Sequence, residues 1–266
     1  MFFNSIFTAE RNDKSEKNVV EIQKILSHTR RACEHYDLID DGDVIAVGIS
    51  GGKDSLALLL ALDEMRRFYP KKYDIIGVTV DIGAPGMDFS EVARLCEERG
   101  IRYHIEKTHI YEVVFDVRKE SNPCSLCSKM RRGVLHETAK ACGANKIALG
   151  HHNDDVVETF MLNLFYEGRV GCFQPKTYLS RTDVTVIRPF VYLEEKEIKS
   201  FCRKVPLPVV ESTCPADKDS KRADMKELLY KLDRENRGLR TRIFGAVCRG
   251  EIDGFKEIKG QTREKD

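Results

Sequence analysis

The chain has 266 residues, of which 41% are hydrophobic and 33% are charged, and its 44 basic and 43 acidic side chains leave a net charge of +1. This composition suits one soluble core domain with small additions. It excludes a strongly basic protein that coats polyanions, although a local basic patch stays open. No apolar run approaches the roughly 20 residues of a membrane-spanning helix, and the N-terminus lacks the pattern of a signal peptide. We therefore expect a cytoplasmic protein without a membrane partner.

Hydrophobic periodicity predicts alternating strands and helices along most of the chain. Strands are expected over 43–49, 73–81, 102–106, 146–150 and 184–190, and helices over 17–36, 54–67, 88–98, 125–142, 154–166, 194–204 and 221–248. Such alternation predicts an α/β fold, a doubly wound parallel sheet with helices on both faces. We divide the chain into an N-terminal helical segment (1–40), an α/β domain (41–205) and a C-terminal helical segment (206–266).

A glycine-rich segment between the first strand and the next helix holds Ser50, Gly51, Gly52, Lys53, Asp54 and Ser55. Adjacent glycines let the backbone approach a ligand, and a helix start offers unpaired N–H groups to phosphate. The pattern is not a Walker loop, because Val47 and Asp54 stand where that motif needs Gly and Ser or Thr. SGGKDS resembles the pyrophosphate loop of ATP pyrophosphatases, which split ATP between the α and β phosphates. An ordinary capped turn is the alternative.

Two further segments stand at the ends of predicted strands. Asp81 closes the second strand, at the sheet edge where such folds bind ligands. Gly150, His151, Asp154 and Asp155 end a later strand and open the next helix. We expect the carboxylates to hold Mg²⁺ on the phosphates of ATP, and the histidine to contact nucleotide or substrate. The alternative is that Asp154 and Asp155 merely begin a helix, where carboxylates are favoured.

Nine cysteines in a chain without an export signal favour free, metal-binding or catalytic thiols over a disulfide scaffold. Cys124 and Cys127 form a C-x-x-C at a predicted helix start, where the helix dipole can stabilise thiolates. Cys214 lies far downstream, in a loop before another helix. From these residues alone, a redox pair, a zinc site and an iron–sulfur cluster all stay open.

The motifs together resemble the tRNA 2-thiocytidine synthetase family over about residues 21–244. SGGKDS is followed by PCSLCSKMRRG (123–133), by KIALGHHNDD (146–155) and by a single downstream cysteine, and PCSLC with MRRG is the most discriminating piece. Some members of that family have a second C-x-x-C at the downstream cysteine. This chain lacks it, because Pro215-Ala216-Asp217 follows Cys214. By this match only Cys214 can supply a third cysteine.

This resemblance implies an activity and its cofactors. Cys124, Cys127 and Cys214 would hold a [4Fe–4S] cluster with one iron open to carry sulfide. ATP, bound with Mg²⁺, would activate the C2 oxygen of cytidine at position 32 of the tRNA, in the anticodon loop, and sulfur would displace AMP. Asp54 is assigned to catalysis together with the three cysteines.

Basic side chains follow both cysteine segments, namely Lys129, Arg131, Arg132, Lys221 and Arg222. If the two segments meet in space, these cations form a positive rim suited to the phosphates of a looped-out RNA strand. Two solvated helix faces are the alternative. The expected partners are tRNA and a sulfur donor, such as a cysteine desulfurase or free sulfide, and a homodimer stays open.

The leading hypothesis is an ATP-dependent tRNA-cytidine sulfurtransferase that forms AMP and pyrophosphate. A lysidine synthetase adenylates the same base, but it attacks with lysine and has no use for three thiols. A small-molecule ligase of the same superfamily and a non-catalytic ATP- and zinc-binding module also stay open. A closed structural zinc site needs a fourth ligand, and no histidine in the sequence is obviously placed to supply it.

Overall fold

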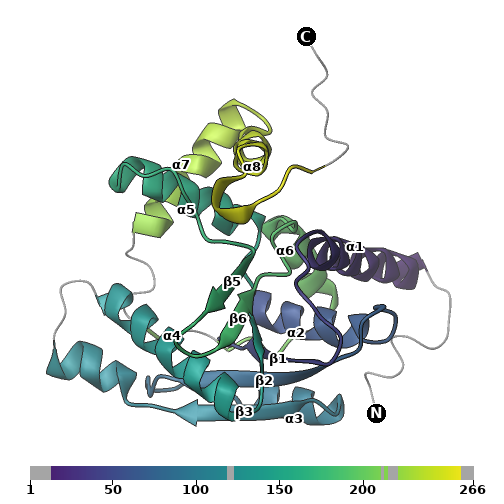
Figure 1. Ribbon diagram of the computed structural model, residues 1–266, viewed down its shortest axis with the longest axis vertical. Coiled ribbons are helices and arrows are strands. Elements are labelled where there is room, and N and C mark those ends of the chain that lie inside the picture. The colour runs from purple at the N-terminus through teal and green to yellow at the C-terminus, as the bar shows by residue number, and fades with distance from the viewer. Residues whose placement is uncertain (1–12, 119–122, 211–212, 215–220, 259–266) are drawn as a thin grey trace.

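The computed structural model describes residues 13–118, 123–210, 213–214 and 221–258. Its strands are β1 (Asp43–Gly48), β2 (Tyr73–Asp81), β3 (Arg102–Lys107), β4 (Lys146–Ala148), β5 (Lys176–Leu179) and β6 (Val184–Ile187). The described residues form a six-stranded sheet in the order β3-β2-β1-β4-β6-β5 (Figure 1). All neighbouring pairs are parallel except β5 and β6, which run antiparallel. The predicted α/β fold with a mostly parallel sheet is confirmed.

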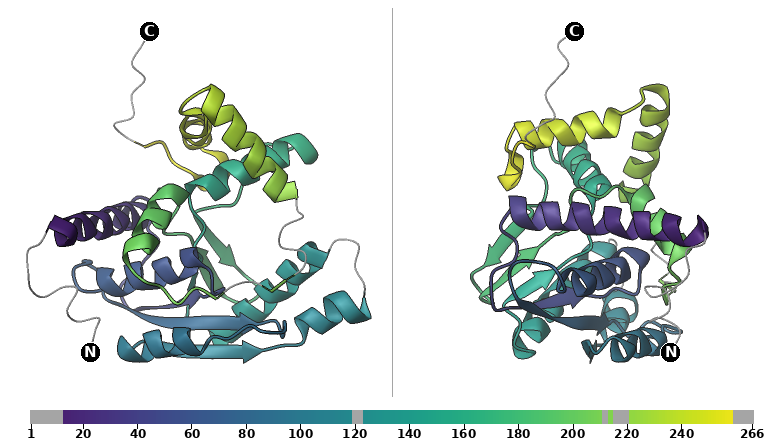
Figure 2. Two further views of the ribbon diagram at one scale, coloured as in Figure 1. Left: turned by 180° about the vertical axis from the view of Figure 1, so that it is seen from behind. Right: turned by 90° about the vertical axis from the view of Figure 1, so that its right-hand side faces the viewer.

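Helices pack against both faces of this sheet. The helices of the described residues are α1 (Asp13–His35), α2 (Lys53–Met65), α3 (Ser90–Glu98), α4 (Pro123–Ala141), α5 (Asn153–Tyr166), α6 (Glu195–Lys204), α7 (Lys221–Glu235) and α8 (Leu239–Arg249), with a π-helical turn at Glu112–Val117 and a 3₁₀ turn at Ile252–Gly254. Helices α1, α2 and α6 contact one another over one face, and α4 lies on the other (Figures 1 and 2).

The side chains of β1 show why both faces are covered. Successive residues of a strand point to opposite faces of a sheet. Ile45 and Val47 enter the hydrophobic cluster under α2 and α6, whereas Ala46 enters a second cluster that Ala139 of α4 completes. A strand with both faces buried carries a continuous apolar run, as DVIAVG does. The run therefore predicts the central place of β1 in the sheet.

The edge strand β5 was not predicted from the sequence. Its side chains are only half-buried or exposed, so it lacks the apolar signature of the central strands. The turn that joins it to β6 contains Asp183, whose backbone is left-handed (φ 51°). Asp183 Oδ1 accepts a hydrogen bond from the Tyr178 hydroxyl at 3.0 Å, and Lys140 Nζ lies 2.9 Å from Oδ2. The turn is thus fixed by side-chain contacts that no local pattern indicates.

The segment predicted to be helical over 221–248 forms two helices, because the chain turns between α7 and α8. Gly238 stands at the break with a left-handed backbone (φ 80°), which glycine adopts without steric cost. Both helices pack on α5 and form a separate layer beyond the edge of the sheet (Figure 2). The predicted C-terminal helical segment therefore lies on α5, the helix that follows the GHHNDD sequence.

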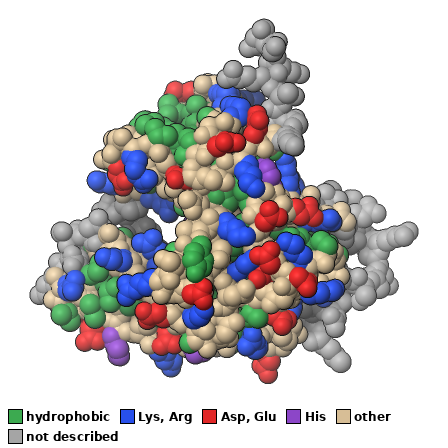
Figure 3. Space-filling model, viewed as in Figure 1, with side chains coloured by type: hydrophobic (Ala, Val, Ile, Leu, Met, Phe, Trp, Pro, Cys, Tyr) green, Lys and Arg blue, Asp and Glu red, His purple; other side chains and the backbone are tan. Residues whose placement is uncertain are grey.

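The surface has no dominant charge on the face seen in Figure 3, where acidic and basic side chains are interspersed. This distribution agrees with the net charge of +1. Within the described ranges, no helix combines the length and the apolar composition that crossing a bilayer requires.

Candidate active site

The glycine-rich loop joins β1 to α2 at the carboxyl edge of the sheet, and its shape depends on Gly51. This residue has a left-handed backbone (φ 86°), and a Cβ there would stand 2.8 Å from Cβ of Val210. Gly52 immediately precedes α2, and no side chain of the described residues caps that helix end. The first amide groups of α2 are therefore available to an anion, which the helix dipole favours at this position.

Two serines hold the loop in its conformation. Ser55 Oγ donates to the carbonyl oxygen of Gly52 at 2.8 Å and accepts from the amide of Ser50 at 3.2 Å. Ser50 Oγ lies 3.3 Å from the amide of Gly52. The sequence predicts that both serines contact nucleotide. The structure shows that they shape the loop, and their contact with a ligand stays a prediction.

Lys53 and Asp54 form an ion pair at the start of α2. Lys53 Nζ lies 2.8 Å from Asp54 Oδ2 and 3.2 Å from Glu195 Oε1. Burial acts to lower the pKa of Lys53, but its bonds to Asp54 and the charge of Glu195 outweigh burial and raise it. Asp54 Oδ1 is buried and has no hydrogen-bond partner among the described residues. Orphaned buried oxygens are uncommon, so this one fits a cation such as Mg²⁺.

The end of β4 touches the start of α2. A Cβ on Gly150 would stand 2.9 Å from the carbonyl oxygen of Asp54, so only glycine fits this approach. The next residue, His151, packs against Phe173 with ring centroids 5.0 Å apart and ring planes tilted by 35°. Burial and the positive charge of Arg188 lower the pKa of His151 to about 4. The imidazole is therefore neutral near pH 7, and its buried Nδ1 has no partner among the described residues.

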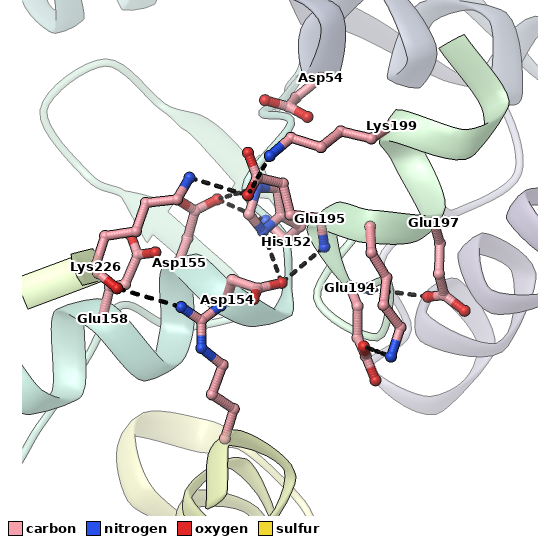
Figure 4. Close-up of polar contacts among 12 residues, drawn as sticks. Asp54, His152, Asp154, Asp155, Glu158, Glu194, Glu195, Glu197, Lys199 and Lys226 are labelled. Carbon is pink, nitrogen blue, oxygen red and sulfur yellow. Dashed lines mark hydrogen bonds and ion pairs between the residues drawn. The ribbon is translucent and has the colours of Figure 1, made fainter. Parts of the chain in front are cut away.

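The two aspartates at the start of α5 are engaged with protein groups. Asp154 Oδ2 accepts from the amide of Glu195 at 2.7 Å, and its other oxygen pairs with Arg240 of α8 (Figure 4). Asp155 Oδ2 accepts from the amide of His152 at 2.9 Å and completes a capping box. This is the helix-start arrangement that the sequence left as an alternative. A role for either carboxylate toward Mg²⁺ stays a prediction.

Asp81 ends β2 at the same edge of the sheet. Its Oδ1 accepts a hydrogen bond from the amide of Gly83 at 2.9 Å, and its carbonyl oxygen accepts from Thr108. The side chain thus stabilises the turn that leaves β2, and its predicted contact with nucleotide stays a prediction.

A cavity of about 470 Å³ brings the loop and the cysteine segments together. Residues from the loop, from the start of α4 and from the chain before α7 line it, among them Ser50, Gly52, Cys124, Cys127 and Cys214. Burial raises the pKa of Cys127, the positive charge of Arg131 opposes this, and the charges of Cys214 and Cys124 add to the rise. The C-x-x-C pair and the distant Cys214 therefore share one chamber with the loop.

The donor set of this chamber is sulfur-rich, which suits soft metals and iron–sulfur clusters. In the part of the chain that the structure describes, no three Cys, His, Asp or Glu side chains lie close enough together to hold a metal ion. The chamber therefore contains the sulfur atoms that the predicted site needs. The ligand role of the three cysteines stays a prediction.

The predicted basic rim converges on the cavity in part. Arg131 and Arg222 line it. Arg222 also reaches α5, where its Nε lies 3.4 Å from Glu158 Oε2. Lys129 and Arg132 are exposed on α4, and the ammonium of Lys221 lies 4.8 Å from the ring centroid of Tyr166. Among the five basic residues of the predicted rim, only these two arginines therefore line the cavity that holds the cysteines.

Sequence reasoning missed the groups on α6, α7 and α8 that contact these residues. Glu195 pairs with Lys53 across 142 positions of sequence, and Arg240 pairs with Asp154 across 86. Lys226 of α7 pairs in turn with Glu195. Acidic residues at the start of α6 indicate a helix cap, which Glu194 and Glu197 form. No local pattern reports which of these carboxylates points to the loop.

A parallel sheet whose first strand ends in a glycine-rich, lysine-bearing loop at a helix start defines a nucleotide-binding α/β protein of the pyrophosphate-loop class. The family model described as "PP-loop domain" matches residues 17–233. The chain is 41% identical over 231 residues (86% of this chain, 90% of the relative) to the tRNA-cytidine(32) 2-sulfurtransferase of Geobacter sulfurreducens. It is 42% identical over 229 residues (85% and 89%) to that of Geobacter metallireducens. The chain belongs to the PP-loop family and, within it, to the tRNA-cytidine(32) 2-sulfurtransferase family.

A solved structure shares the fold. The U34-tRNA thiolase NcsA from Methanococcus maripaludis, with its [4Fe–4S] cluster, matches with a TM-score of 0.69 and 25% identity. The match covers 90% of this chain and 85% of the thiolase. The predicted family and the predicted fold are thus both confirmed.

Proposed function

We propose that the protein is an ATP-dependent tRNA-cytidine(32) 2-sulfurtransferase that forms AMP and pyrophosphate. The observation that supports it is the shared cavity, which Gly52 of the loop and the thiols of Cys124, Cys127 and Cys214 line together. Activation of a base and delivery of sulfur to it require the reacting groups to meet in one chamber. Relatives about 40% identical carry the name of this activity.

In the proposed reaction, the phosphates of ATP bind at the amino end of α2. The helix dipole, its unpaired amides and Lys53 favour the negative charge. Asp54, whose Oδ1 is buried without a partner among the described residues, would hold Mg²⁺. The C2 oxygen of cytidine attacks the α-phosphorus and pyrophosphate leaves. Sulfide then adds at C2, and AMP departs with the original oxygen. Further proposed nucleotide contacts are Asp81, Gly150, His151, Asp154 and Asp155.

The three cysteines are the proposed ligands of a [4Fe–4S] cluster, and the thiolase that shares the fold carries a cluster of this type. When bound, the cluster would supply the chemistry that delivers sulfur to the activated cytidine. Cys124 and Cys127 lie in the first turn of α4, where the helix dipole stabilises thiolates. Arg131 adds a positive charge beside Cys127.

The tRNA is proposed to reach this chamber over its basic rim. Arg131 and Arg222 line the cavity and are the proposed phosphate contacts, with Lys129, Arg132 and Lys221 further out. The C-terminal segment (206–266) supplies Cys214 and Arg222, and the α/β domain (41–205) supplies the ATP loop. A cysteine desulfurase or free sulfide is the proposed sulfur donor.

The test begins with strictly anaerobic purification and measurement of iron and acid-labile sulfide. Roughly four irons per chain are expected, as a cubane cluster requires. The protein is then incubated with unmodified tRNA, ATP, Mg²⁺ and sulfide, and the tRNA nucleosides are analysed by mass spectrometry. Formation of 2-thiocytidine at position 32 supports the proposal. An iron-free protein that attaches lysine to cytidine would favour a lysidine synthetase instead.

A further inference from the structure

A partly buried carboxylate that the proposed reaction does not use contacts the loop lysine. The side chain of Glu195, at the start of α6, is 12% exposed. Its Oε1 lies 3.2 Å from Lys53 Nζ, and its Oε2 lies 3.1 Å from Lys199 Nζ and 2.9 Å from Lys226 Nζ. Three lysines from α2, α6 and α7 therefore share one carboxylate. Figure 4 shows Lys199 and Lys226 converging on Glu195.

The main chain of Glu195 is held in place by a second carboxylate, that of Asp154. The amide of Glu195 donates to Asp154 Oδ2 at 2.7 Å, and Asp154 is itself paired with Arg240 of α8. Burial acts to raise the pKa of Glu195, but hydrogen bonds from Lys226 and Lys199 outweigh burial and lower it to about 2. The group is therefore ionised at every pH at which the protein would work.

Two carboxylates already offset the positive charge of Lys53. An ammonium group has three N–H donors, so Asp54 at 2.8 Å and Glu195 at 3.2 Å leave one donor for a further partner. Phosphate at the amino end of α2 requires the same ammonium. Because Asp54 is the next residue in the chain and Glu195 comes from another helix, the longer contact is the one that phosphate can replace.

We propose that Glu195 is a positioning residue that holds Lys53 beside the loop and competes with phosphate for its ammonium group. This rests on the proposed ATP site. The competition weakens binding of the pyrophosphate left after adenylation, because the negative charge of Glu195, 3.2 Å from Lys53 Nζ, offsets the positive charge that would attract the phosphates. Glu195 thereby favours release of pyrophosphate, while Lys199 and Lys226 keep its carboxylate occupied.

The test compares the binding of inorganic pyrophosphate, by titration calorimetry, to the full-length protein and to Glu195→Gln. The amide keeps the size of the side chain and removes its charge. We expect the Kd for pyrophosphate to fall about fivefold, with a steeper dependence on salt, because the lysines lose their counter-ion. Glu197→Gln is the matched control on the same helix, since Glu197 pairs with Lys24 at 2.6 Å and points away from this cluster (Figure 4).

A second variant predicts the opposite sign. Lys226→Gln removes a competitor for Glu195, so Glu195 should hold Lys53 more firmly and the Kd for pyrophosphate should rise. Weaker or unchanged pyrophosphate binding by a folded Glu195→Gln protein overturns the inference, and so does tighter binding by Lys226→Gln. If the unmodified protein binds neither ATP nor pyrophosphate, the proposed function itself fails, which is a different outcome.

Discussion

Gly150 lies directly against the main chain of Asp54, where a Cβ would come within 2.9 Å of the carbonyl oxygen. The end of β4 thus supports the first turn of α2. We expect Gly150→Ala to displace that turn and to weaken ATP binding about tenfold, because the amides that face phosphate move with it. Titration calorimetry with ATP measures the effect.

The control for this substitution is Gly133→Ala. Gly133 lies within α4, and an added Cβ meets nothing within 4 Å there. Alanine is about 0.5–1 kcal/mol more favourable than glycine in a helix interior, so this variant should be slightly more stable and bind ATP normally. Equal losses of ATP binding in both variants would contradict the role given to the Gly150 contact.

The loop residues should affect nucleotide use and leave the cluster intact. We expect Asp54→Ala and Lys53→Ala each to lower the rate of ATP–pyrophosphate exchange by about 100-fold, because Lys53 is the proposed phosphate contact and Asp54 the proposed ligand of Mg²⁺. Iron content after anaerobic purification should stay unchanged. Loss of iron with normal exchange would overturn this separation of roles.

Cys214 should behave in the opposite way. We expect Cys214→Ala to abolish formation of 2-thiocytidine and to keep ATP binding, because it removes a proposed cluster ligand that lines the cavity and leaves the loop intact. Cys142→Ala is a suitable control. Cys142 packs against the hydrophobic side chains between the sheet and α4, and it does not line that cavity. Nucleoside mass spectrometry measures both. If Cys214→Ala still thiolates tRNA, the three-cysteine assignment is wrong.

The burial of His151 predicts a dependence of stability on pH. Its pKa is lowered in the folded state from the ordinary value of 6.5 to about 4. Between these values the unfolded chain binds a proton that the folded chain does not, so stability falls as the pH falls through this window. His151→Gln should flatten that part of the profile, measured as the urea midpoint at about pH 5 and about pH 7.5.

His109→Gln is the matched control, because the His109 side chain is 89% exposed. Its profile should follow that of the unmodified protein. The burial argument fails if His151→Gln keeps the full loss of stability between the higher and the lower pH.

The parts of the fold that local patterns specify could be predicted. The run DVIAVG followed by two glycines and a lysine located β1, the loop and α2, because a buried strand and a phosphate-binding turn each have a distinct signature. The strand predicted over 73–81 matches β2 at both ends. The glycine at 238 carries the signal of the break between α7 and α8, but a continuous charged pattern on both sides masked it.

Long-range pairing could not be predicted in the same way. The contacts of Glu195 with Lys53 and of Asp154 with Arg240 join residues 142 and 86 positions apart, and several neighbouring charges would serve equally well on sequence grounds. Only packing of α5, α6 and α8 selects the pairs. The same holds for β5, whose place at the edge is fixed by the partner strand and the turn at Asp183.

The ion pair between Asp154 and Arg240 has a consequence for shortened chains. A protein that ended before Leu239 would still contain SGGKDS, the C-x-x-C pair, GHHNDD and Cys214, so every recognisable motif would be present. It would nevertheless leave a nearly buried carboxylate without its guanidinium, at a cost of about 3–5 kcal/mol, beside the amide that positions Glu195. Relatives that lack the last helix should therefore have a different residue at this aspartate.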